Sequence, residues 1–66
     1  MNQKEKSIVH ILMEAKMDND MITYIMLKLN GNENYLNKLM TSLNNMVKTG
    51  ITEEKLMKEV MKITEN

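Results

Sequence analysis

The sequence predicts an all-α fold, a small bundle of three to four short helices in which residues 1–66 form a single domain. Apolar residues recur at the i, i+3, i+4, i+7 spacing of amphipathic helices along most of the chain. Short polar or glycine-containing breaks separate these periodic segments, and no linker is long enough to divide two domains. The expected helices span about 3–17, 20–30, 33–49 and 52–64.

The first expected helix begins with a capping box, because Asn2 is followed three residues later by Glu5. It carries two apolar faces on nearly opposite sides. One face consists of Ile8, Ile11, Leu12 and Ala15, and the other of Val9, Met13 and Met17. A single small domain rarely buries both faces of one helix.

The second expected helix follows the polar break Asp18-Asn19-Asp20, with Asp20 as its expected N-cap. Its two apolar sides are Ile22, Ile25, Met26 and Leu29 on one, and Met21, Tyr24 and Leu27 on the other. The sequence therefore predicts a hairpin that is buried on two sides or covered by another chain. Because the break lacks Gly and Pro, the two helices could also straighten and exchange between protomers as a swapped dimer.

The third and fourth helices are ordinary amphipathic helices with clear start and stop signals. Gly31 ends the preceding helix and Asn32 caps the next, whose apolar stripe is Tyr35, Leu36, Leu39, Met40, Leu43, Met46 and Val47. Gly50 ends that helix and Thr52 caps the last one. The apolar side of the last helix is Leu56, Met57, Val60, Met61 and Ile63.

Composition excludes several classes of function. Nine lysines balance nine acidic residues, so no net field attracts the chain to nucleic acid or to an anionic membrane surface. No apolar run approaches the roughly 20 residues of a membrane span, and the polar start does not resemble a signal peptide. The absence of cysteine fits a reducing compartment. We therefore expect a cytoplasmic protein with no membrane segment, and the charge balance disfavours a nucleic-acid partner.

Catalytic and metal-binding patterns are too incomplete to predict an enzyme or a cofactor. His10, with Glu14 one turn later, offers two ligands where zinc requires three or four. The Asp18-Asn19-Asp20 run begins like a calcium loop, but Thr23 stands in place of its glycine and Leu29 in place of its bidentate glutamate. We expect no catalytic residues, no metal and no small-molecule substrate.

A helix-turn-helix is the alternative interpretation of the second half of the chain. The segment from Met46 to Val60 contains a helix end, Gly50 at the turn, and a second helix. A DNA-reading helix normally opens with basic or amide side chains, whereas this helix opens with Glu53 and Glu54. A DNA-binding regulator therefore remains the second candidate.

The segment Leu12-Met13-Glu14-Ala15-Lys16, followed by a polar break and an apolar helix, resembles the helical hook of Sin-type antirepressors. Those small helical proteins inhibit a DNA-binding regulator by replacing its own dimerisation contact. The segment lacks the aromatic residue and the proline-containing cap of that hook, so no residue role is carried over. The resemblance implies only a mechanism that this composition permits.

The surplus apolar face of the first two helices is the predicted functional feature. Methionine is flexible and polarizable and suits contact surfaces as well as irregular cores, and the chain has nine. We expect Met40, Met46, Met57 and Met61 to fill the core. The predicted protein interface is Val9, Met13, Met17, Met21, Tyr24 and Leu27, with Tyr24 as its anchor. These residues predict a non-enzymatic regulator or adaptor that self-associates or docks on a partner protein, unless the other helices cover both faces.

Overall fold

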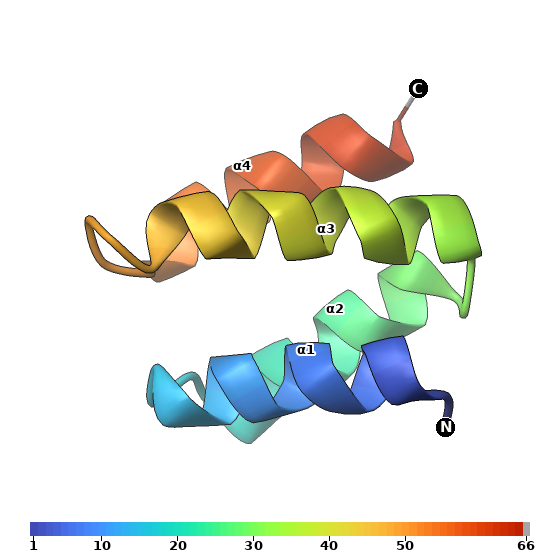
Figure 1. The fold of residues 1–66 in the computed structure, drawn as a ribbon, viewed down its shortest axis with the longest axis horizontal. Coiled ribbons are helices and arrows are strands. Elements are labelled where there is room, and N and C mark those ends of the chain that lie inside the picture. The colour runs from blue at the N-terminus through green and yellow to red at the C-terminus, as the bar shows by residue number, and fades with distance from the viewer. Residues whose placement is uncertain (66) are drawn as a thin grey trace.

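The computed structural model describes residues 1–65, which contain four α-helices joined by short turns (Figure 1). They are α1 (Gln3–Glu14), α2 (Asn19–Leu29), α3 (Glu33–Met46) and α4 (Glu53–Thr64). No strand occurs within this described range, which confirms the predicted all-α bundle. The predicted helices at 3–17 and 33–49 are each about three residues too long at their C-terminal ends.

The four helices form two antiparallel hairpins that pack on each other (Figure 1). Helices α1 and α2 form the lower hairpin in that view, and α3 and α4 form the upper one. Across the two hairpins α1 packs on α3, and α2 packs on α4. Each helix thus has two main neighbours, and its apolar residues meet those of the others between the hairpins.

The core consists almost entirely of branched aliphatic side chains. Its fully or nearly fully buried members are Ile8, Leu12, Ile22, Ile25, Leu29, Leu36, Leu39, Leu43, Met46, Leu56, Val60 and Ile63. No polar or charged residue is buried within residues 1–65, so hydrophobic burial stabilises the fold without internal polar networks.

Most methionines lie at the edge of the core and not at its centre. Of the four expected to fill the core, Met46 is buried, and Met40 and Met57 are half-buried against it. The expectation is wrong for Met61, which is 38% exposed. Met61 lies on the margin of the α4 apolar stripe, where neighbouring helices no longer cover it.

Local hydrogen bonds explain where the helices begin. The predicted caps Asn2, Asn32 and Thr52 each accept a backbone N–H of the first turn, and Glu5 completes the predicted capping box. The predicted cap Asp20 is wrong. Asp18 caps α2 instead, because its extended backbone places its carboxylate to accept the Asp20 N–H at 3.0 Å.

A Schellman motif ends α1 earlier than the periodicity predicts. The Met17 N–H donates to the Leu12 carbonyl and the Lys16 N–H to the Met13 carbonyl, both at 3.0 Å. Lys16 adopts a left-handed backbone with φ of 64°. The chain therefore reverses after Glu14, and α1 and α2 form a hairpin in this structure instead of one straight helix.

The turn between α3 and α4 similarly shortens the predicted third helix. The N–H groups of Thr49 and Gly50 both donate to the Met46 carbonyl, at 3.0 and 2.7 Å. Gly50 has a φ of 99°, a conformation that glycine adopts without steric cost. Val47 falls at the helix end and is 60% exposed, so the predicted apolar stripe of α3 stops at Met46.

Candidate interaction surfaces

The structure divides the six predicted interface residues into two groups. Met13, Tyr24 and Leu27 are exposed, by 58%, 45% and 73% of their surfaces. The other three, Val9, Met17 and Met21, are half-buried and pack against the core. We call the three exposed residues, Met13 from α1 with Tyr24 and Leu27 from α2, the α1–α2 surface.

The half-buried members are covered because each helix has two neighbours. A helix that contacts two others buries more than one stripe, and the flanks of the core stripe become half-buried. Met17 has a second reason, since it is the residue that a Schellman motif folds back toward the helix end. Periodicity identified the apolar flanks but could not show which flanks a neighbouring helix covers.

Tyr24 and Leu27 lie on the same side of α2, because residues three apart on a helix are neighbours. The Lys28 ammonium nitrogen lies 6.0 Å from the centroid of the Tyr24 ring, within cation–π range. The aromatic ring is therefore held at the surface with a positive charge beside it.

A second apolar feature lies where α1 meets the end of α3. A shallow open cavity of about 480 Å³ is lined by His10, Ile11, Glu14, Ala15, Val47 and Ile51. The sequence interpretation missed it, because Val47 continues the α3 stripe in sequence but emerges after the helix ends. The turn signal at Gly50 was the one local indication that the stripe stops there.

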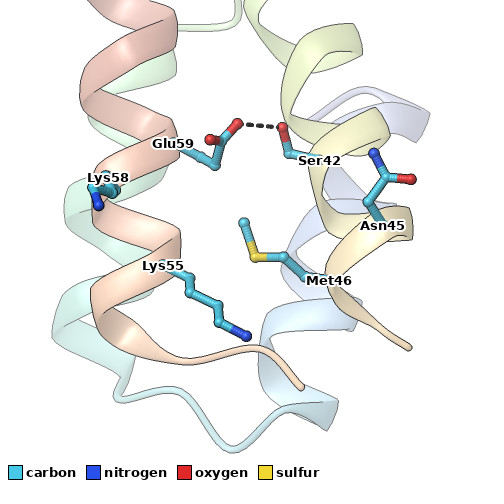
Figure 2. Close-up of a pocket in the computed structure, with 6 residues that line it drawn as sticks. All are labelled: Ser42, Asn45, Met46, Lys55, Lys58 and Glu59. Carbon is cyan, nitrogen blue, oxygen red and sulfur yellow. Dashed lines mark hydrogen bonds between the residues drawn. The ribbon is translucent and has the colours of Figure 1, made fainter. Parts of the chain in front are cut away.

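The groove between α3 and α4 is lined mainly by polar and charged residues (Figure 2). Two adjoining hollows of about 300 and 370 Å³ share Ser42 and Glu59. The Ser42 hydroxyl donates a hydrogen bond of 2.7 Å to Glu59 Oε1 across the groove. The remaining lining residues are Lys38, Thr41, Asn45, Met46, Lys55, Lys58, Lys62 and Ile63. We call this feature the α3–α4 groove.

The lysines of the α3–α4 groove were also missed from sequence. Lys55, Lys58 and Lys62 have the i, i+3, i+7 spacing that places side chains on one helix side, and this was the available signal. Lys38 joins them only through the fold, because it lies on α3. Overall charge balance concealed the local concentration of positive charge.

Side chains that could hold a metal ion are not clustered in residues 1–65. His10 and Glu14 line the same cavity, but no cluster of three or more His, Cys, Asp or Glu side chains occurs in this range. Lys4 and Glu33 form an ion pair at 2.7 Å, which joins the starts of α1 and α3 at the surface. Among the described helices, each is too short or too polar to cross a membrane.

Comparison with protein-family models, with curated proteins and with solved structures finds no match for this chain.

Proposed function

We propose that the protein is a small non-enzymatic interaction module that self-associates through the α1–α2 surface. The observation that carries the proposal is the exposure of Leu27 and Tyr24 side by side on α2. Leu27 is the most exposed large aliphatic side chain apart from the terminal Met1 in residues 1–65. Burying a leucine side chain stabilises an assembly by about 1.5–3 kcal/mol, so contact with a second apolar surface is favourable.

Two further observations support an interface on this hairpin. Tyr24 combines a large apolar ring with a polar tip, which is the residue type enriched at the centres of protein interfaces. The domain is also small, and a chain of this size leaves a large share of its apolar surface uncovered when it is alone. Self-association reduces that exposed share.

Light scattering coupled to gel filtration, measured over a range of protein concentrations, tests the proposal. The native chain is expected to shift from monomer toward dimer mass as concentration rises, and Leu27→Ser to remain monomeric at concentrations where the native chain is dimeric. Val47→Ser is the matched control, since Val47 is similarly exposed but lies at the end of α3. A native chain that is monomeric at high micromolar concentration contradicts self-association.

The sequence also predicts a second role for the α1–α2 surface, which is docking on a partner protein as a regulator or adaptor. A monomeric native chain would favour this role. Cross-linking from a photoreactive residue at position 27 in the native host distinguishes that role. Partner docking is supported by a specific cross-link to another protein that excess native chain prevents and excess Leu27→Ser protein does not. The absence of any cross-linked product contradicts partner docking.

A DNA-binding regulator remains the alternative, and the α3–α4 hairpin gives it little support. One hollow of the α3–α4 groove is lined by Asn45 and Lys55, and the other is lined by Lys38 and Lys62. The helices therefore run side by side in antiparallel register (Figure 1), whereas helix-turn-helix elements cross at about 90–120°. Retardation of duplex DNA by the purified protein would favour this alternative.

A further inference from the structure

We infer that the α3–α4 groove is a docking site for an acidic amphipathic helix of a partner protein. This goes beyond the proposed function, because the groove is lined by residues of α3 and α4 alone and carries a different chemistry from the α1–α2 surface. Four features argue for this occupant: the register of the two helices, the apolar floor, the lysine rim and the central carboxylate.

The first feature is a shallow trough of two adjoining hollows between the neighbouring helices α3 and α4. Ser42 and Glu59 are hydrogen-bonded where the two hollows adjoin, one hollow extends along Asn45 and Lys55, and the other extends along Lys38 and Lys62. From position 38 to position 45 the α3 wall rises about 10 Å at 1.5 Å per residue. That length matches two turns of a docked helix.

The floor of the trough is apolar. Met46 and Ile63 are almost fully buried and form part of the lining of the two hollows. In Figure 2 the Met46 side chain extends from α3 into the space between the helices, below the Ser42–Glu59 hydrogen bond. An apolar floor between two helices is the geometry into which an amphipathic helix lays its apolar face, and methionine adapts its shape to such partners.

Lysines dominate the charge of the groove. Leaving Lys62 aside, Lys38, Lys55 and Lys58 line it together with one carboxylate, that of Glu59, so lysines outnumber carboxylates in the lining. The chain as a whole has a formal charge of zero. Glu53 and Glu54, which precede these lysines on α4, do not line the groove. The local positive charge therefore complements a negatively charged partner.

The central carboxylate favours a helix over a nucleic-acid strand as the occupant. Glu59 lies across the middle of the groove, where it repels a phosphate chain that follows the trough. An amphipathic helix can instead keep its carboxylates beside the lysines at the edges and away from Glu59. The groove lining also contains no arginine and no aromatic residue on which a base could stack.

Fluorescence anisotropy with a defined probe tests the inference. The probe is a labelled synthetic helix of about 18 residues with leucine at every third or fourth position and glutamate beside each leucine, long enough for measurable helicity. The comparison probes are the same peptide with lysine for glutamate, the same peptide with serine for leucine, and a labelled single-stranded oligonucleotide. We expect saturable binding of the first probe alone, weakened by added salt.

Two substitutions in the groove are expected to change the affinity for the acidic probe in opposite directions. Lys58→Gln removes a rim charge and is expected to weaken binding of the acidic probe about threefold, as for one exposed ion pair. Glu59→Gln keeps a side chain that can accept from Ser42 and removes the central negative charge, so binding is expected to strengthen about threefold. Lys6→Gln on α1 is the matched control, with the same change in net charge and no expected effect.

Binding that follows these signs, and amide chemical-shift changes confined to α3 and α4, supports the inference. Equal affinities for Lys58→Gln and Lys6→Gln, or shift changes on α2 instead, overturn it. Binding of the oligonucleotide without the acidic peptide overturns it in favour of nucleic acid. Leu27→Ser is expected to bind the probe normally, so failure of this inference is distinguishable from failure of self-association.

Discussion

Lys16 is the one lysine in residues 1–65 with a left-handed backbone, with φ of 64° at the turn between α1 and α2. A residue with a Cβ in this conformation carries about 1–2 kcal/mol of steric strain, and glycine does not. Lys16→Gly is therefore expected to raise the free energy of unfolding by about 0.5–1 kcal/mol after glycine's larger loss of chain entropy is subtracted. Urea denaturation followed by circular dichroism measures this change.

Lys6→Gly is the control for that prediction, because Lys6 lies in the interior of α1, where glycine lowers stability by about 1 kcal/mol. The two substitutions should therefore have opposite signs. A Lys16→Gly protein that is destabilised like Lys6→Gly would contradict the left-handed turn. It would also favour the straightened α1–α2 helix of a swapped dimer, in which position 16 is helical and has no such strain.

Capping residues show what sequence predicts at the scale of one residue. Asn2, Asn32 and Thr52 were predicted correctly, because a short polar side chain next to an apolar-periodic segment has few other roles. The second helix was ambiguous, since Asp18 and Asp20 carry the same chemistry two residues apart. The choice depends on the backbone that the preceding Schellman motif delivers, and that motif is not visible from residue type.

The corrected cap of α2 can be tested directly. Asp18→Ala removes the acceptor of the Asp20 N–H and is expected to lower the free energy of unfolding by about 1 kcal/mol. Asp20→Ala removes only an exposed first-turn carboxylate and is expected to cost about half as much. Chemical denaturation of the two variants checks the order, and a larger loss for Asp20→Ala would restore the original prediction.

At the scale of one element, the two apolar sides of α2 differ in their burial. Ile25 is fully buried and its neighbour Tyr24 is 45% exposed. Ile25→Ala is expected to lower the free energy of unfolding by about 2–5 kcal/mol through the cavity it leaves. Tyr24→Ala is expected to leave helicity unchanged and to weaken assembly by about 2 kcal/mol, as for an interface anchor.

Circular dichroism and light scattering on the same samples distinguish these two effects. Loss of the fold in Tyr24→Ala, with no separate defect in assembly, would assign Tyr24 to the core. Periodicity alone could not make this division, because α2 is apolar on nearly all sides. The packing of α2 against both α1 and α4 decides which of its apolar residues stay in contact with water.

For the whole molecule, the sequence was sufficient to predict four helices and their order, because each start and stop signal acts within a few residues. It was insufficient for the surfaces, which depend on how the two hairpins pack. The half-burial of Val9 and Met21 follows from neighbouring helices, and one hollow of the α3–α4 groove is lined by both Lys38 and Lys62, which are 24 positions apart in the sequence. Such groupings are properties of the bundle and not of any single helix.

The position of the two surfaces on different hairpins leads to a prediction for the whole molecule. The α1–α2 surface takes its residues from α1 and α2, and the α3–α4 groove takes its lining from α3 and α4. The two sites share no residue, so they are expected to bind their partners independently. Substitutions at distant sites that share no contacts usually have additive effects on free energy. Leu27→Ser should therefore abolish dimer formation and leave the affinity for the acidic peptide unchanged, whereas Lys58→Gln should weaken peptide binding about threefold and leave dimer formation unchanged.

The double variant tests this independence, because its two defects should equal those of the single variants within about 0.5 kcal/mol. Light scattering measures the first defect and fluorescence anisotropy the second. If saturating peptide shifted the dimerisation constant of the native chain, the two sites would be coupled, and reciprocity would require dimerisation to change peptide affinity by the same factor. With independent sites, a dimer joined through α1 and α2 presents two free grooves, which is the arrangement of an adaptor that brings two acidic helices together.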